Sequence, residues 1–120
     1  MNYDISLLDE KERKLARYLE EHTTDEVLKE AQEYIPSLRS HSDIFRKLSE
    51  MNIPQPVINT IIYYVLATNN QQLVAYQLLM LADLCRKCKI KNAQAAITFC
   101  KQYYSYHYSN KSRSLKSIFP

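Results

Sequence analysis

The sequence predicts an all-α fold, a compact bundle of five or six helices. Three observations support this prediction: apolar residues recur at intervals of three and four, polar capping signals separate the apolar segments, and none of the 120 residues is glycine. Hairpin turns and phosphate-binding loops commonly need glycine, so sheet-rich folds and Rossmann-type or phosphate-loop enzymes are not expected. With 46% hydrophobic residues, the chain is expected to form one domain with its own core.

The first quarter of the chain predicts two helices. Apolar residues share one face of a first helix that begins at Ser6 or Asp9 and ends at Glu21. Thr23, followed three residues later by Glu26, has the spacing of a capping box and is expected to open a second helix. This helix must end before the next proline, because the residue before a proline is driven out of the α-helical region.

The middle of the chain predicts two more helices. Ser40 or Ser42 is expected to cap a third helix, whose apolar residues recur at three and four. Prolines in the segment 52–56 then interrupt the chain, and the second of them suits the first turn of a fourth helix, Val57–Thr68. This helix has the widest apolar face, so we expect it at the centre of the core, with the asparagines at 69 and 70 ending it in place of glycine.

The last part of the chain predicts a fifth helix over Leu73–Cys88 and a sixth from about Asn92 toward Tyr104. Beyond these helices the periodicity is lost in a segment rich in serine and basic residues. We therefore predict a helical domain over residues 1–108, followed by a flexible basic tail over residues 109–120.

The net charge of +3 conceals a strong asymmetry. Residues 1–50 contain eight Lys or Arg against twelve Asp or Glu, whereas residues 51–120 contain eight against one. A basic half of this kind predicts contact with a polyanion or with an acidic partner. The alternative is a solvated charge distribution that has no partner.

The basic half also contains aromatic residues of the kind that nucleic-acid-binding surfaces use. Four cations cluster where the fifth helix ends, and tyrosines interleave with lysines further on, which combines phosphate-binding charge with surfaces for base stacking. The candidate DNA-binding residues are Arg86, Lys87, Lys89, Lys91, Lys101, Tyr103, Tyr104, Tyr106, Lys111 and Arg113. Two simpler explanations stay open: the macrodipole favours cations at a helix C-terminus, and Tyr103 and Tyr104 can pack against the bundle.

Other chemistry has little support in the sequence. Cys85 and Cys88 form a Cys-x-x-Cys pair, but Cys100 and His107 are too far apart for the second half of a zinc site, so we expect ordinary thiols and no metal or cofactor. The spacing brings no histidine near a carboxylate or a nucleophile, so no enzyme activity is expected. The odd number of cysteines predicts a reduced, cytoplasmic protein, and the longest apolar stretch falls short of the ~20 residues that span a membrane.

Three segments of the sequence resemble a known family. They are Ser6-Leu-Leu-Asp-Glu-Lys-Glu-Arg-Lys14, Ile35-Pro-Ser-Leu-Arg39 and Ile53-Pro-Gln-Pro-Val-Ile-Asn-Thr-Ile-Ile-Tyr-Tyr-Val65. On these segments, residues 6 to about 105 resemble the C-terminal domain of Gram-positive primosomal replication initiation and membrane attachment proteins, in the DnaD/DnaB-like family. The resemblance implies a small helical domain that binds DNA, preferably single-stranded, and helps to load the replicative helicase at origins and restart sites.

The resemblance also implies partners and functional positions. The implied partners are single-stranded and double-stranded DNA, a helicase loader, a DnaD-like initiation protein and the replicative helicase. It further implies oligomerisation through a domain outside this chain, association with the nucleoid and contact with the membrane. The family's motif in the fifth helix, Tyr-x-x-x-Ile-x-x-x-Trp, falls on Gln77, Leu81 and Cys85, so only its aliphatic middle is kept. The cations from Arg86 to Lys89 match the family's basic turn.

Two alternative functions stay open. An exposed apolar groove or the acidic N-terminal helices would make the chain a protein-interaction module that docks the helicase loader or another primosome protein. The basic tail, which contains Leu115, Ile118 and Phe119, would instead contact an anionic lipid surface.

Overall fold

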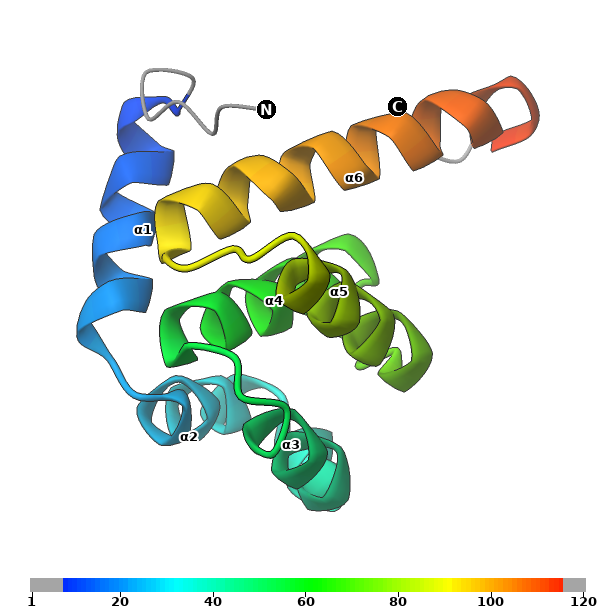
Figure 1. Ribbon diagram of the computed structural model, residues 1–120. Helices are drawn as coiled ribbons and strands as arrows, with labels where there is room; N and C mark the ends of the chain where they lie inside the picture. Colours follow the sequence, from blue (N-terminus) through cyan, green and yellow to red (C-terminus); the bar gives the residue numbers. More distant parts are fainter. Residues whose placement is uncertain (1–7, 116–120) are drawn as a thin grey trace.

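Six α-helices and one 3-10 helix make up the protein in a computed structural model that describes the backbone of residues 8–115 and the side chains of residues 8–105 (Figure 1). In chain order they are α1 (Glu10–Glu21), α2 (Thr24–Tyr34), η2 (Pro36–His41), α3 (Ser42–Ser49), α4 (Gln55–Thr68), α5 (Ala75–Lys87) and α6 (Ala93–Leu115). No strand occurs among these described residues, so the predicted all-α fold class is confirmed. The radius of gyration is 14.1 Å, close to the ~14 Å expected of a folded chain of this length.

Helix α4 occupies the centre of the bundle. Helices α1, α2, α5 and α6 pack against it, and in Figure 1 α6 crosses above α4 and α5 while α2 and α3 lie below them. Val57, Ile61 and Val65 of α4, one turn apart, have no exposed surface. These contacts confirm the prediction of a central apolar helix. A helix that is apolar around most of its circumference needs partners on every side. None of the described helices is long and apolar enough to cross a membrane.

The first two helices begin at the caps that their sequences encode. At α1, the side chain of Asp9 accepts a hydrogen bond from the N–H of Glu12 at 2.8 Å, and the Glu12 carboxylate accepts one from the N–H of Asp9 at 3.0 Å. Thr23 and Glu26 form the same reciprocal pair at α2, as predicted. Each capping box satisfies two N–H groups that have no partner inside the helix. Of the two predicted starts of α1, the one at Asp9 is correct.

Helices α4 and α5 end without glycine. After α5, Lys89 adopts φ 57°, its N–H donates to the carbonyl of Arg86 at 3.2 Å, and the N–H of Ile90 donates to the carbonyl of Cys85 at 3.0 Å. These two bonds form a Schellman motif, whose left-handed residue is usually glycine because a side chain there costs about 1–2 kcal/mol. Asn70 adopts φ 54° after α4, so asparagine replaces glycine there, as the sequence predicted.

Helices α4 and α5 begin and end within two residues of their predicted bounds, whereas the start of α3 and the end of α6 differ in kind from the predictions. No serine caps α3, because η2 continues directly into it; the N-cap residue is His41, and the hydroxyl of Ser40 donates to a carbonyl within η2. Helix α6 continues to Leu115, into the segment predicted as a tail, because residues 105–115 contain neither proline nor glycine to end it. The rest of that segment, residues 116–120, lies outside the described part of the chain.

Candidate nucleic-acid interface

Four of the candidate DNA-binding cations lie together where α5 connects to α6. Arg86 and Lys87 form the last two residues of α5, and Lys89 and Lys91 follow in the connection to α6. All four side chains are exposed. We call these four residues the basic turn.

Among the described carboxylates, that of Asp83 pairs with cations of the basic turn. Asp83 lies one helical turn earlier on α5, where one of its oxygens accepts a hydrogen bond from Arg86 at 2.5 Å and the other lies 3.0 Å from Lys87 Nζ. Hydrogen bonds from Lys87 and Arg86 hold the pKa of Asp83 below its ordinary value. Lys89 and Lys91 form no ion pair with any side chain that the structure describes. The basic turn therefore keeps a clear excess of positive charge.

Hydrogen bonds fix the backbone where this connection enters α6. The carboxylate of Glu20 on α1 accepts a hydrogen bond from the N–H of Ala93 at 2.6 Å, and the Asn92 side chain accepts one from the N–H of Ala95 at 2.8 Å. These bonds satisfy two of the N–H groups that the start of α6 would leave without a partner. Ile90, between the two lysines, is only 4% exposed. The connection is anchored in the core while its lysine side chains remain exposed.

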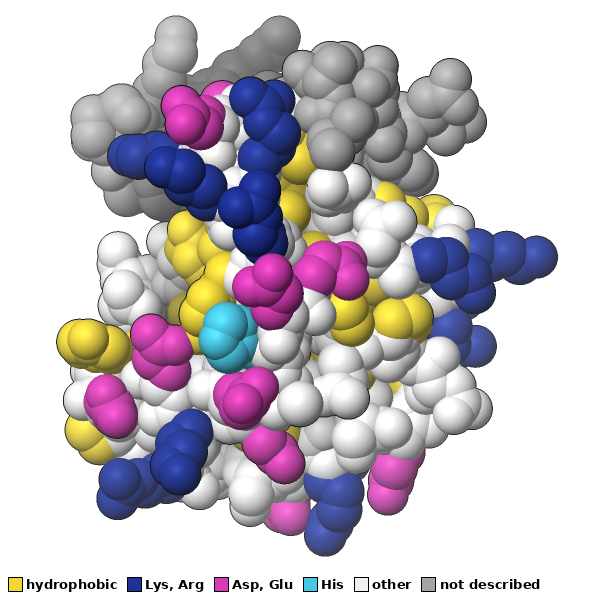
Figure 2. Space-filling model, turned by 90° about the vertical axis from the view of Figure 1, so that its left-hand side faces the viewer, with side chains coloured by type: hydrophobic (Ala, Val, Ile, Leu, Met, Phe, Trp, Pro, Cys, Tyr) yellow, Lys and Arg dark blue, Asp and Glu magenta, His cyan; other side chains and the backbone are white. Residues whose placement is uncertain are grey.

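Figure 2 views the molecule from the side that α1 covers. Asp and Glu side chains gather over the centre and lower part of this face, whereas a separate group of Lys and Arg side chains projects from its right-hand edge. Further cations lie toward the upper end, where α1 begins. The exposed cations of α1 are Lys11, Arg13, Lys14 and Arg17. Lys and Arg side chains also lie at the lower left and along the bottom of this face, so in its lower part the two signs of charge are mixed.

Lys101 lies in a different environment from the basic turn. Its Nζ is 2.9 Å from a carboxylate oxygen of Glu12 on α1, and the two side chains are 39% and 20% exposed. It lies about two helical turns along α6 from Ala93, the first residue of that helix. Lys101 was predicted to contact DNA; its charge is paired across the α1–α6 interface, so such a contact would require it to exchange Glu12 for a phosphate.

The described tyrosines of α6 pack against the bundle. Tyr104 is 6% exposed, its hydroxyl donates to Gln77 at 2.6 Å, and its ring stacks on Tyr64 with the ring centroids 6.3 Å apart. Tyr103 is partly buried and meets Tyr104 edge to face, at 5.1 Å between centroids. Tyr104 therefore cannot offer its ring to a base, and the simpler explanation of packing holds for it. Three other candidates have side chains outside the described ones: Tyr106, Lys111 and Arg113.

The three family-motif positions lie on the inner side of α5. Leu81 and Cys85 have no exposed surface. The side-chain oxygen of Gln77 accepts hydrogen bonds from Tyr104 of α6 and, at 2.8 Å, from Asn69 at the end of α4. Gln77 thus joins three helices. Because this side of α5 is interior, the residues at these three positions belong to the core and not to an exposed stacking surface.

The cysteines of the Cys-x-x-Cys pair occupy different environments. Cys85 is buried, whereas Cys88 is exposed at the end of α5. Burial, with a smaller contribution from Cys88, raises the pKa of Cys85 to about 12, and burial also raises the pKa of the buried Cys100. Within the part of the chain that the structure describes, no three potential metal ligands form a group. One thiol of the pair is therefore interior and the other lies at the surface.

A buried asparagine holds the end of α1, a role that the sequence pattern did not indicate. Asn59 lies on α4 with no exposed surface, and its Nδ2 donates to the carbonyls of Leu19 at 3.1 Å and His22 at 2.9 Å. These carbonyls belong to the C-terminal end of α1, whose last turn contains no basic residue. The sequence contains one signal for this role, which is an asparagine in the middle of the most apolar helix. A buried polar group costs about 1–3 kcal/mol unless it is hydrogen-bonded, so such a residue is expected to have a partner.

Two grooves border α2. The larger, about 780 Å³, lies between α2, η2, α3 and α4, and the smaller, about 420 Å³, lies between α1, α2 and α4. Tyr34 and Tyr63, which are 80% and 42% exposed, line the smaller groove. Its one charged lining residue, Glu30, accepts a hydrogen bond from Tyr18. Burial, this bond and the charge of Glu30 raise the pKa of Tyr18 to about 12.

Comparisons with known protein families, with curated proteins and with solved structures find no match. The family indicated by the sequence resemblance therefore stays a prediction. The geometry of the basic turn is the main structural guide to function.

Proposed function

We propose that this protein is a DNA-binding domain of a replication initiation or restart complex, which holds single-stranded DNA at the basic turn and helps to load the replicative helicase. The observation that carries the DNA contact is the basic turn itself, with four exposed cations in six consecutive residues, two of which pair with Asp83. The resemblance to primosomal initiation proteins supports the replication role.

In this proposal the lysines of the connection bind phosphates first. Lys89 and Lys91 pair with no carboxylate among the described residues, whereas Arg86 and Lys87 must exchange Asp83 for a phosphate. A guanidinium group can bind a phosphate through two parallel hydrogen bonds, so this exchange is favourable for Arg86. Each phosphate that is neutralised releases condensed counterions. Phosphate contacts carry no sequence information, so binding through them should be weak and show little sequence preference.

Salt dependence tests this mechanism. If about three phosphates are neutralised, raising the salt from about 50 to 200 mM should weaken the binding of a single strand about 20-fold. The measurement is fluorescence anisotropy with a labelled oligothymidine of about 20 nucleotides, which covers more than one binding site of ordinary size. An affinity that does not change with salt would rule out phosphate contacts as the source of binding.

A charge-matched pair of variants locates the contact. The variant Lys89→Asn/Lys91→Gln removes two cations from the basic turn and keeps a residue that tolerates the left-handed backbone at position 89. The control, Arg17→Gln/Lys47→Gln, removes two exposed cations from α1 and α3. We expect the first variant to reduce the salt slope by about 1.4 and the control to leave it unchanged. Equal losses in both variants would mean that DNA responds only to the overall charge.

A further inference from the structure

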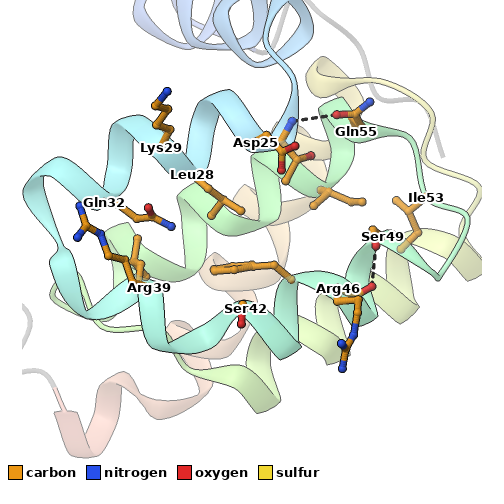
Figure 3. A pocket seen from close by; sticks show the side chains of 14 residues that line it. Asp25, Leu28, Lys29, Gln32, Arg39, Ser42, Arg46, Ser49, Ile53 and Gln55 are labelled. Atoms are coloured by element: carbon orange, nitrogen blue, oxygen red, sulfur yellow. Dashed lines mark hydrogen bonds between the residues drawn. The ribbon is translucent and has the colours of Figure 1, made fainter.

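The larger groove combines an apolar floor with one closed end. Four of its lining residues are buried apolar side chains from η2, α2, α4 and the segment before α4: Leu28, Leu38, Ile53 and Ile58. Phe45 of α3, which is partly buried, also lines it. At the closed end the N–H of Thr24, the first residue of α2, donates to the side chain of Gln55, the first residue of α4, at 2.9 Å (Figure 3). We call this feature the α2–α3 groove.

Three cations from three different elements line the α2–α3 groove, together with the carboxylate of Asp25 near its Gln55 end. Lys29 comes from α2, Arg39 from η2 and Arg46 from α3. In Figure 3, Lys29 and Arg46 lie on opposite sides of the groove and Arg39 lies toward the end away from Gln55. Arg46 pairs with Asp43 at 3.3 Å, whereas Lys29 and Arg39 form no ion pair with a described side chain.

The separation of these cations decides what kind of ligand fits. A single phosphate or a small anion is bound by donors that converge on one point, whereas these three cations are spread around the rim. An apolar floor between separated cations suits an extended occupant that is apolar on one side and acidic along its edges. An amphipathic helix in a groove has this pattern, with its apolar residues at intervals of three and four. A nucleic acid strand has no continuous apolar side to cover Leu28 and Phe45.

The smaller groove lacks a comparable pattern. Its one charged lining residue, Glu30, is already hydrogen-bonded to Tyr18, and its other lining residues give no charge with which to choose a partner. Of the two grooves, only the α2–α3 groove therefore indicates the chemistry of its occupant.

We propose that the α2–α3 groove binds an acidic amphipathic helix of a partner protein. The apolar side of that helix would cover Leu28, Phe45 and Ile58, and its carboxylates would pair with Lys29 on one side and with Arg39 at the end away from Gln55. This goes beyond the DNA contact and does not depend on it, because the groove is formed by α2, η2, α3 and α4, whereas the basic turn belongs to α5 and the connection to α6. The protein can therefore hold a DNA strand and a protein partner at the same time.

A designed peptide tests the proposal directly. The probe is a fluorescein-labelled peptide of about 18 residues, long enough to form a helix, with Leu and Phe at intervals of three and four and Glu at most other positions. Two further peptides serve as comparisons: a scrambled sequence of the same composition, and a version with Lys in place of Glu. We expect the acidic amphipathic peptide to bind at least about tenfold more tightly than either of them. When the acidic peptide is added to the unmodified protein, the amide chemical shifts should change mainly in α2, η2 and α3.

Charge reversal at the rim provides a matched control. Lys29→Glu/Arg39→Glu should weaken binding of the acidic peptide by about tenfold or more, because two attractive contacts become repulsive. Lys11→Glu/Lys47→Glu changes the net charge equally at exposed positions that do not line the groove, and it should bind the peptide nearly as well as the unmodified protein. Circular dichroism checks that both variants keep their helix content.

Three results would overturn the proposal. The first is that the acidic peptide does not bind, or binds no better than its scrambled form. The second is an equal loss in the two double variants, which would indicate only a response to overall charge. The third is that Lys29→Glu/Arg39→Glu abolishes oligonucleotide binding while Lys89→Asn/Lys91→Gln does not, which would make the groove the DNA site. Failure of the DNA proposal alone would leave peptide binding intact and would appear only in the oligonucleotide titration.

Discussion

Helices α5 and α6 differ between their inner side and the end where they connect. On the inner side, Cys85 and Leu81 are buried and Tyr104 is hydrogen-bonded to Gln77. At the connecting end, the four cations of the basic turn are exposed, and among the described carboxylates Asp83 pairs with two of them. The fold therefore separates cations and aromatic residues that occur in the same basic half of the sequence.

This difference indicates which substitutions affect stability and which affect binding. Inner residues of α5 and α6 contribute through burial and shared hydrogen bonds, so changes there should lower the free energy of unfolding. Exposed cations near the C-terminus of α5 interact favourably with the helix dipole, but such contacts contribute only a few tenths of a kcal/mol to about 1 kcal/mol. Changes in the basic turn should therefore act mainly on DNA affinity.

The largest expected contrast is between the two thiols of α5. Cys88 is exposed, whereas Cys85 is buried and its pKa is raised to about 12, so little reactive thiolate forms there at pH 8. Cys85 can react only when the fold opens, and ordinary stabilities of about 5 kcal/mol or more make this at least about a thousandfold slower. Reaction with a disulfide reagent should show one fast thiol in the native protein and three in guanidinium.

The variant Cys88→Ser is the control for this contrast. It should remove the fast phase and leave the slow phase unchanged. If two thiols of the native protein react quickly, the inner side of α5 is accessible in solution, and the separation of inner side and basic turn is wrong.

Substitution of Tyr104 should have the next largest effect. Tyr104→Ala removes a buried ring and its bond to Gln77, so we expect the free energy of unfolding to fall by about 3–5 kcal/mol, measured by urea denaturation. Tyr104→Phe keeps the ring and should cost about 1 kcal/mol. At temperatures where Tyr104→Phe is folded, its affinity for the oligonucleotide should equal that of the unmodified protein. A clear loss of affinity in Tyr104→Phe would return this tyrosine to the DNA-binding surface.

The fold was largely predictable because its signals are local. Helical periodicity, the capping box of Thr23 and Glu26, and the apolar stretch of α4 each depend on residues within a few turns of one another, and the structure confirms all three. The end of α6 was not predictable in this way, because the helix continues through residues that are compatible with a helix but carry no apolar pattern.

The candidate site was only partly predictable because its residues are sorted by contacts between distant segments. Lys101 and Lys91 look alike in the sequence, but Glu12 of α1 pairs with one of them and no described side chain pairs with the other. Likewise, Asn59 reaches the end of α1, about 40 residues earlier in the chain. Neither contact can be inferred from spacing along the chain. The groove cations Lys29 and Arg39 were missed because each lies among acidic or polar neighbours in an acidic half.

The smallest expected effect concerns the backbone of the basic turn. Lys89 has φ 57°, where glycine or asparagine is favoured, so Lys89→Gly should stabilise the protein by about 1 kcal/mol and Lys89→Asn by less. Lys89→Ala keeps the unfavourable left-handed conformation and should give no stabilisation. All three variants lose the same charge, so their affinities for the oligonucleotide should fall to the same extent. Urea denaturation and the oligonucleotide titration measure the two properties on the same samples.

These three variants separate charge from conformation at one residue. Stability that rises with Lys89→Gly while affinity falls would confirm that the turn is strained in its backbone and that its side chain serves binding. If Lys89→Gly does not stabilise the protein, the Schellman motif is not populated in solution. If the glycine variant binds DNA more weakly than the asparagine variant, backbone rigidity contributes to affinity beyond charge, because a flexible turn must be ordered before its remaining cations can meet the phosphates.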